Sequence, residues 1–209
     1  MGSRMPGSAD IYSYSIYLTA GLVPWIAFSN TIARSTSVFL DKRHLISKIK
    51  LSLPALIIYI ILSETITFII TMMLFFVFLF CTGSHFKKNI LLIPFVYYLQ
   101  QLFAFGFGLL TATLTVFIRD LREIVGIILQ LWFWFTPIVY LRLILPDVVS
   151  SIMQYNPAYV IIESYHNIFL FNKDPNYGAL IVMTILIHGM IFISYKVFRA
   201  LEKDVRDFL

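Results

Sequence analysis

One stretch constrains the fold more than any other: residues 119–146, where a charged turn leads into a long uncharged run. The run at 124–141 approaches the ~20 apolar residues with which a helix crosses ~30 Å of hydrocarbon. Its far end is aromatic and is interrupted by Pro137, which removes a backbone hydrogen bond. The stretch therefore predicts a membrane span with a charged entrance and an aromatic, kinked exit.

Composition favours a membrane protein over a soluble one. Hydrophobic residues make up 59% of the chain and charged residues 13%, against roughly 45–50% and 25% in soluble domains. A soluble chain of 209 residues could not bury that much apolar surface, whereas a bilayer can cover it. The alternating pattern of a transmembrane barrel is absent. We therefore expect an all-α polytopic membrane protein.

Several other classes of function are excluded by the same sequence. The single Cys81 rules out an intrachain disulfide framework and a multi-cysteine metal site. The net charge of +5 comes from basic residues in short loops, so it indicates topology rather than nucleic-acid binding. No G-x-x-x-x-G-K-[ST] loop occurs, so nucleotide chemistry cannot reside in this chain.

The apolar runs predict a single transmembrane domain, 1–209, with five spans, at 17–40, 55–81, 90–118, 124–142 and 179–198. Residues 41–54 are too charged to cross and form a loop. Residues 146–177 hold two half-length apolar pieces, which are typical of short re-entrant or interfacial helices. Gly106 and Gly108 in the third run are expected to mark close helix contacts, because small residues let helices approach.

The distribution of Lys and Arg predicts the orientation. The 41–54 loop, the 119–123 turn and the C-terminal tail together carry about twice as many of these residues as the opposite loops, and such an excess marks the cytoplasmic side. The N-terminus is then expected outside. Because residues 1–10 lack the apolar core of a signal peptide, an upstream span is expected to be missing.

Four stretches carry a family resemblance: AGLVPWIAFSNTI at 20–32, LTVFIRDLREIVGIILQLWFWFTPIVY at 114–140, YNPAYVIIESYHNIFL at 155–170 and FRALEKDVRDFL at 198–209. Their order and spacing resemble the permease subunit of ABC type-2 exporters, in the branch that exports O-antigen, capsule or teichoic acid. The resemblance implies a six-span fold, here without its first span, in the bacterial plasma (inner) membrane. It also implies a homodimer with two ATPase subunits, which would carry the ATP and Mg, and no cofactor in this chain.

The 41–54 loop is the first candidate site. Leu45 and Ile49 share a helical face, with cations before and after them. The resemblance implies a short helix that docks into a groove of the ATPase subunit; the alternative is a basic loop attracted to anionic lipid. The expected coupling residues are Lys42, Arg43, His44, Leu45, Ile46, Lys48 and Ile49.

The charged turn and the aromatic run are the next candidates. The turn is either self-paired surface charge of little energetic value or a cytoplasmic gate made of Arg119, Asp120, Arg122 and Glu123. The aromatic residues form either an interfacial belt or a path on which sugar rings stack. The candidate path residues are Trp25, Trp132, Phe133, Trp134 and Tyr140, of which only part can line one surface, because residues 132–134 are consecutive on a helix.

Two sites with ionisable residues complete the set. Glu64 lies inside an apolar run, where an acid is a functional candidate with a buried partner; Arg34 is a conceivable partner, and the alternatives are a structural carboxylate or proton coupling. Glu163 and His166 at i, i+3 could suit a metal or an acid–base pair. One pair without further ligands is too small a set, so no metal site is predicted.

These observations favour a non-enzymatic permease subunit of an ATP-driven exporter of a lipid-linked polysaccharide. The alternatives are the same family with a drug or lipid as cargo, a membrane-embedded transferase acting on lipid-linked sugars, and a non-transporting fragment.

Overall fold

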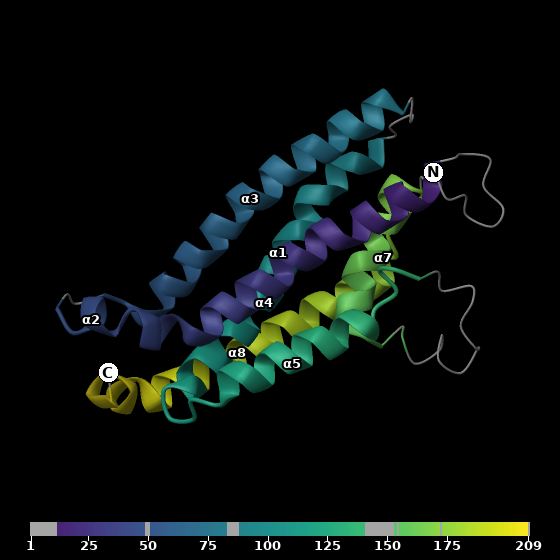
Figure 1. The fold of residues 1–209 in the computed structure, drawn as a ribbon. Helices are drawn as coiled ribbons and strands as arrows, with labels where there is room; N and C mark the ends of the chain where they lie inside the picture. The colour runs from purple at the N-terminus through teal and green to yellow at the C-terminus, as the bar shows by residue number, and fades with distance from the viewer. Residues whose placement is uncertain are drawn as a thin grey trace. The chain divides into compact units, whose positions relative to one another are not determined.

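The computed structural model describes residues 12–48, 51–82, 88–140, 153, 155–171 and 173–208, and these residues contain helices and no strand (Figure 1). The α-helices are α1 Ser13–Asp41, α2 Arg43–Ile46, α3 Leu53–Cys81, α4 Ile93–Thr115, α5 Leu121–Trp134, α7 Pro157–Phe169 and α8 Tyr177–Phe208. A 3-10 helix, η1 at Lys88–Leu92, leads into α4. The expected all-α class is confirmed.

Four helical segments are long and apolar enough to cross a membrane: Ser13–Asp41, Leu53–Cys81, Lys88–Thr115 and Tyr177–Phe208. They coincide with the expected spans at 17–40, 55–81, 90–118 and 179–198, which supports a polytopic membrane protein. The remaining expected span, 124–142, corresponds to α5, which has 14 residues. At ~1.5 Å per residue this helix is roughly 20 Å long, so the count of five spans is not confirmed.

The prediction that Pro137 kinks the end of that helix is wrong, because α5 ends at Trp134, before the proline. Proline has no N–H to continue the helix, and it disfavours helical geometry in the residue before it. Side chains satisfy the carbonyls left at the helix end. The hydroxyl of Thr136 donates to the carbonyl of Trp132 at 2.9 Å, and that of Tyr140 donates to the carbonyl of Trp134 at 2.7 Å.

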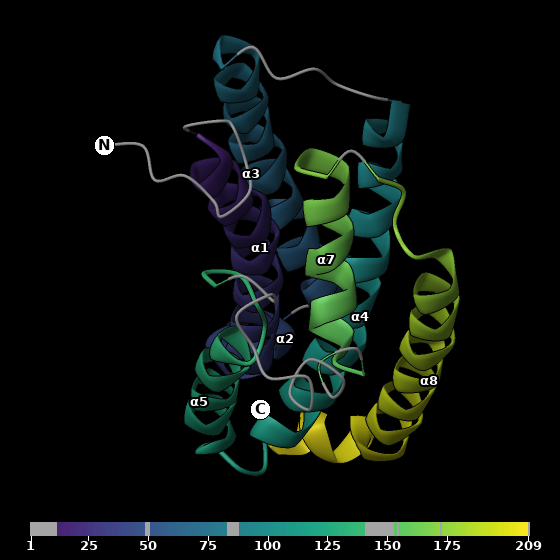
Figure 2. The ribbon, with the colours of Figure 1, turned by 90° about the vertical axis from the view of Figure 1, so that its right-hand side faces the viewer.

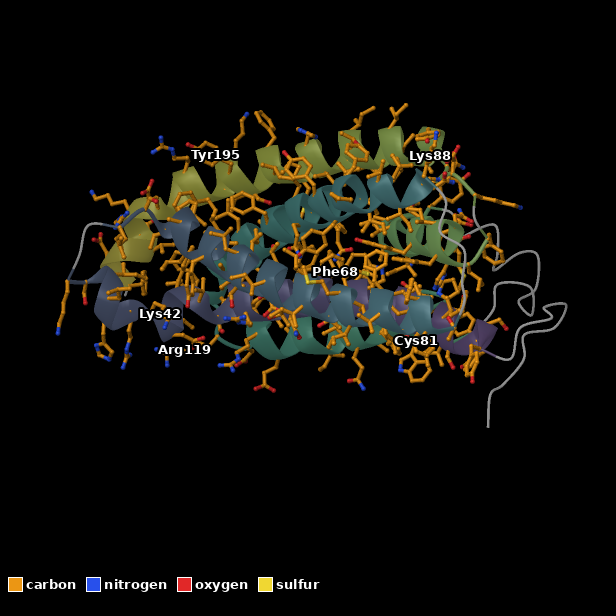
Figure 3. All side chains as sticks on the ribbon, turned by 90° about the horizontal axis from the view of Figure 1, so that it is seen from above. Lys42, Phe68, Cys81, Lys88, Arg119 and Tyr195 are labelled. Atoms are coloured by element: carbon orange, nitrogen blue, oxygen red, sulfur yellow. The ribbon has the colours of Figure 1, made fainter. Side chains whose placement is uncertain are left out.

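The chain divides into two compact units, and each takes parts of several helices. Unit 1 comprises Met1–Ile26, Thr67–Tyr98 and Trp132–Met183, and unit 2 comprises Ala27–Ile66, Leu99–Leu131 and Thr184–Leu209. Unit 2 contains all three basic segments that the charge distribution assigns to the cytoplasm: 41–54, 119–123 and the end of α8. Figure 3 shows Lys42 and Arg119 toward the same end of unit 2.

In unit 1, α7 packs on α1 and α3 (Figure 2). The rings of Tyr17 and His166 are stacked with centroids 3.9 Å apart, and Phe75 meets Phe169 edge to face at 5.0 Å. Helix α7 begins at a proline, and the side chain of Asn156 accepts a hydrogen bond from the Ala158 N–H, which is a favourable N-terminal cap. Residues 146–152, 154 and 172 of the expected outer segment lie outside the described residues.

In unit 2, one hydrophobic cluster joins α1, α2, α3, α4 and α8. Its buried members are Val38, Phe39, Ile46, Leu53, Ile57, Ile60, Leu109, Ala112, Val116, Phe198 and Val205. Small residues bring the helices together: a Cβ on Gly108 would lie 2.7 Å from Ser35 Cβ, and one on Gly106 would lie 3.2 Å from Ile191 and Met190. The expected close contacts at both glycines are confirmed.

Candidate functional site

The expected coupling segment forms one helical turn, α2, directly after α1. Lys42 separates the two helices, and its carbonyl accepts hydrogen bonds from the N–H groups of Leu45 and Ile46. Five of the expected coupling residues have exposed side chains: Lys42, Arg43, His44, Leu45 and Lys48. This turn therefore presents cations and a histidine around one apolar side chain, Leu45.

Ile46 does not belong to that exposed surface. It is 7% exposed and packs in the hydrophobic cluster of unit 2, so its side chain faces the core, and its expected role in coupling stays a prediction. In a single helical turn, adjacent side chains point in different directions, and the core takes Ile46 while Leu45 stays outside. Ile49 lies outside the described residues.

The C-terminal part of α8 braces this segment. The guanidinium of Arg206 donates from Nη2 to the backbone carbonyl of Leu51 at 3.0 Å, and Val205 is fully buried in the same cluster as Ile46. Phe208 meets Phe117, just before the charged turn, edge to face at 5.4 Å. Sequence reasoning placed this tail in the cytoplasm but missed its bracing role, although Phe198, Leu201 and Val205 have the spacing of a buried helical face.

The side chains of the charged turn are open to their surroundings. Arg119, Asp120, Arg122 and Glu123 are all exposed, and none of them forms an ion pair with another residue in the described ranges. The described contacts therefore give no support to a self-paired turn and leave its charges available to other molecules.

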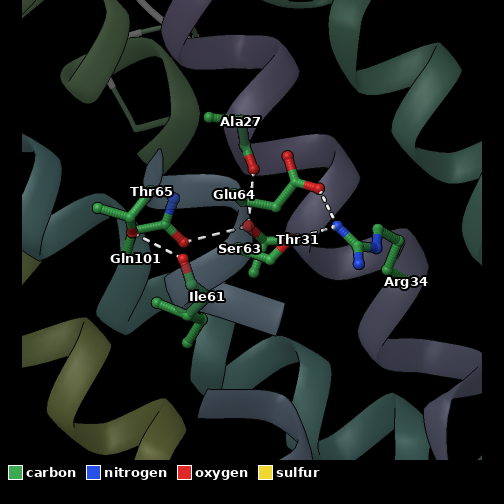
Figure 4. Close-up of polar contacts among 8 residues, drawn as sticks. All are labelled: Ala27, Thr31, Arg34, Ile61, Ser63, Glu64, Thr65 and Gln101. Carbon is green, nitrogen blue, oxygen red and sulfur yellow. Dashed lines mark hydrogen bonds and ion pairs between the residues drawn. The ribbon is translucent and has the colours of Figure 1, made fainter. Parts of the chain in front are cut away.

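The intramembrane acid has the partner that the sequence suggested. Glu64 on α3 is 5% exposed, and its carboxylate accepts from Nη1 of Arg34 on α1 (Figure 4). The same nitrogen lies 3.4 Å from Ser63 Oγ. A charge in the hydrocarbon region is costly, and pairing offsets part of that cost. The ion pair therefore ties α1 to α3 within unit 2.

Polar side chains tie α1 to α4 beside this pair. The hydroxyl of Thr31 lies 2.7 Å from the carbonyl of Ala27 and 3.2 Å from Oε1 of Gln101 (Figure 4). The hydroxyls of Thr36 and Thr111 are 2.9 Å apart. These contacts satisfy polar groups that lipid could not satisfy.

The candidate path residues do not share one surface. Trp25 is buried and lies against Phe133, with ring centroids 5.8 Å apart. Trp132 donates from Nε1 to Oδ1 of Asn156 at 2.8 Å. Trp134, in contrast, is 59% exposed. In unit 1 the aromatic run thus contributes partly to packing and partly to an exposed surface.

His166 holds α7 on α1 through its ring nitrogen Nε2. Its Nε2–H donates to the carbonyl of Tyr17 at 3.1 Å, and Gly21 leaves the room that the imidazole occupies, since a Cβ there would lie 2.9 Å from Nε2. Burial lowers the pKa of His166 to about 4, against a smaller opposing effect of that hydrogen bond. Glu163 instead accepts from the Tyr159 hydroxyl.

Tyr17 also connects α1 to the chain after α5. Its hydroxyl lies within hydrogen-bond distance of the carbonyls of Pro137, at 2.7 Å, and Tyr140, at 2.8 Å. Tyr14 donates to the carbonyl of Val139 at 3.0 Å. No group of three or more His, Cys, Asp or Glu side chains suited to a metal occurs in the part of the chain that the structure describes.

Comparison with known proteins decides the family. Residues 2–170 match the family model described as ABC-2 type transporter. The chain belongs to the ABC-2 type transporter family. That match covers the coupling segment, the ion pair, the charged turn and α7, whereas the bracing end of α8 follows it. Within this membrane family the chain is a permease-type transport component.

Curated relatives of this ABC-2 protein cover most of its length. A protein of Myxococcus xanthus named "O-antigen export system permease protein RfbA" is 25% identical over 200 residues, 95% of this chain and 77% of the relative. Two Klebsiella pneumoniae proteins bear the same name. One is 28% identical over 96% of this chain and 77% of the relative. The other is 29% identical over 83% of this chain and 67% of the relative.

Proposed function

We propose that this ABC-2 family protein is the membrane-spanning permease subunit of an ATP-driven exporter, and that it moves a lipid-linked polysaccharide across the bacterial plasma membrane. The observation that carries the proposal is the similarity, over 95% and 96% of the chain, to two permeases named for O-antigen export. Because the sequence has no phosphate-binding loop, a separate ATPase subunit supplies hydrolysis and holds ATP and Mg. Two copies of the chain enclose the export path.

The ATPase subunit docks on the exposed turn around Leu45, with Lys42, Arg43, His44 and Lys48 giving charge complementarity. Two contacts support this role. Ile46 anchors the turn in the core of unit 2, and Arg206 bonds to the carbonyl of Leu51 behind it. A force applied to the exposed side chains is therefore passed to α1 and α3 instead of being absorbed by a loose loop. The charged turn at 119–123 acts beside it as a cytoplasmic gate.

In this proposal the chain has five spans, and the fourth is the expected span at 124–142, which begins in α5. The exposed aromatic residues at the end of α5 offer flat apolar faces on which sugar rings stack without a fixed hydrogen-bond register. Trp134 is the candidate on α5 for such a contact, whereas Trp25 is buried and packs against Phe133.

Co-expression with candidate ATPase subunits tests the proposal. The wild-type permease should co-purify with its ATPase and support ATP hydrolysis that rises when lipid-linked polysaccharide is added. The variant Arg43→Glu/Lys48→Glu should lose the ATPase, whereas Lys88→Glu, an exposed lysine of unit 1, should retain it. Retention by the double variant would remove α2 as the docking element, and hydrolysis that ignores the polysaccharide would contradict the cargo.

A further inference from the structure

A cavity of about 590 Å³ opens in unit 2 where α1, α3 and α5 meet. Three cations line it, one from each of three chain segments: Arg34 in the middle of α1, Lys42 after its end, and Arg122 at the start of α5. The remaining lining residues are Ala33, Ser37, Val38, Asp41, Leu56, Tyr59, Ile60 and Gly126. Lys42 also belongs to the coupling segment and Arg122 to the charged turn, but neither proposed role concerns the cavity that they line together with Arg34.

The cations of the cavity keep most of their hydrogen-bonding capacity. Arg34 uses only Nη1 toward Glu64 and Ser63 among the described residues, and a guanidinium carries five N–H donors. The side chains of Lys42 and Arg122 form no ion pair in the described ranges. Several donors with positive charge are thus available to an anion in one cavity.

Asp41 is the one carboxylate among the described lining residues, and it cancels only part of this charge. Its Oδ2 accepts a hydrogen bond from Ser37 Oγ at 2.6 Å, which occupies one of its oxygens. Glu64 neutralises Arg34 through their ion pair, so the three cations stand against two carboxylates and one positive charge remains in excess. Converging cations bind phosphate oxygens through short, charge-assisted hydrogen bonds.

Apolar residues from α1 and α3, two helices of membrane-spanning length, form much of the remaining lining. Val38 on α1 and Leu56 and Ile60 on α3 face the cavity with the ring of Tyr59. A free inorganic anion gains nothing from an apolar surface, whereas an amphiphile with an anionic head and a hydrocarbon chain can use the cations and the apolar surface together. Clusters of basic residues at the cytoplasmic end of spans also bind anionic lipid headgroups.

We propose that this cavity binds the phosphate headgroup of a membrane amphiphile, with Arg34, Lys42 and Arg122 on the phosphate and Val38, Leu56 and Ile60 along the chain. The ligand has two possible sources, the diphosphate of the lipid that carries the polysaccharide or a bulk anionic phospholipid. The first source rests on the proposed export function, whereas the second does not. Either source places a phosphate between the coupling segment and the charged turn of unit 2.

Binding to the full-length permease in neutral detergent, without its ATPase, tests the site directly. Farnesyl diphosphate is the probe, and farnesol and inorganic diphosphate are its uncharged and chain-free counterparts. Farnesyl diphosphate should bind about tenfold or more tightly than either counterpart. Farnesol lacks the charge-assisted contacts to the cations, and inorganic diphosphate lacks the apolar contacts of the chain. Equal affinity for farnesol would overturn the proposal, since the cations would then contribute nothing.

A pair of glycine variants distinguishes a blocked cavity from a general loss of folded protein. Gly126 lines the cavity, and a Cβ there meets nothing within 4 Å; Gly189 on α8 has equally open space but is not in the lining. Gly126→Leu should lower the affinity for farnesyl diphosphate about tenfold by filling the cavity, and Gly189→Leu should leave it unchanged. Equal affinity in both variants would contradict the site.

Charge variants identify the donors. Lys42→Gln/Arg122→Gln should lose about tenfold or more in affinity for farnesyl diphosphate, while Lys48→Gln/Arg119→Gln, nearby cations outside the lining, should match the wild type. Phosphatidylglycerol as competitor assigns the source: displacement of the probe at equal concentration supports a bulk-phospholipid site, and weak competition supports the carrier diphosphate. Because no ATPase or polysaccharide is present, a failure here leaves the proposed export function untouched.

Discussion

The imidazole of His166 lies against the ring of Tyr17, with the two ring planes 20° apart, and its Nε2 donates to the backbone carbonyl of the same tyrosine. Two segments separated by most of the chain are thus joined through one residue pair in unit 1. The carbonyl can only accept, so the neutral imidazole carries its proton on Nε2. Protonation of the other nitrogen would place a charge in a buried contact.

This contact predicts that stability falls in mild acid. Burial lowers the pKa of His166 from 6.5 to about 4 in the folded state. Between these values the unfolded chain binds more protons, so the free energy of unfolding rises with pH across that window and falls as pH drops from 6.5 to 4. The loss is on the order of 3 kcal/mol over the whole window. Thermal unfolding of the wild type and His166→Gln at several pH values measures it.

The variant His166→Gln should show a flatter pH dependence between pH 6.5 and 4 than the wild type. His188→Gln, which alters an exposed histidine of α8, is the control and should keep the wild-type slope. Parallel slopes in all three proteins would show that another group governs acid unfolding.

Gly21→Ala should destabilise the same contact sterically. The added Cβ would lie 2.9 Å from His166 Nε2 and 3.2 Å from Ile138 Cγ2, so the packed imidazole must shift. Overpacking of this kind costs about 1–3 kcal/mol. Gly178→Ala is the matched control, since its nearest neighbour, Asn176 Oδ1, lies at an ordinary 3.4 Å. A melting temperature that falls equally in both variants would argue against the close approach of α7 and α1.

Adjacent residues of α2 should separate stability from docking. Ile46→Ala removes a buried side chain from the unit 2 cluster and should cost about 2–4 kcal/mol in the free energy of unfolding. Leu45→Ala truncates a side chain that is 39% exposed, so stability should stay within about 0.5 kcal/mol of the wild type, while ATPase co-purification falls. Thermal unfolding measures the stability of the two variants, and pull-down measures their binding to the ATPase. A stable Ile46→Ala that loses the ATPase, with a destabilised Leu45→Ala that keeps it, would contradict this assignment.

The ion pair between Arg34 and Glu64 should contribute a measurable coupling energy. Arg34 is 46% exposed on its side chain, and solvent screening reduces the energy of such pairs. A double-mutant cycle with Arg34→Gln and Glu64→Gln should therefore give about 1 kcal/mol, in the range found for polar pairs between membrane helices. A cycle on the exposed pair Arg199 and Glu202 of α8 is the control and should give less. Equal coupling in the two cycles would place the Arg34 pair among ordinary surface pairs.

The sequence by itself determined the class of protein, four of the spans and the segment that carries the basic residues, and it offered Arg34 as a conceivable partner of Glu64. Each of these follows from a local property. A run of apolar residues long enough to cross hydrocarbon has few alternatives to a spanning helix, and a buried acid needs a cation within reach. The close helix contacts at Gly106 and Gly108 were also predicted from the sequence, because small residues within an apolar run let helices approach each other.

The tertiary structure alone decided which apolar side chains face the protein and which face outward. Leu45 and Ile46 are equivalent by composition, as are Trp25 and Trp134, yet the core takes one of each pair. In a chain this apolar, hydrophobicity does not distinguish packed faces from lipid-facing ones, so the distinction depends on neighbouring helices. The same holds for the cation cavity, since Arg34, Lys42 and Arg122 come together only when α1 and α5 pack in unit 2.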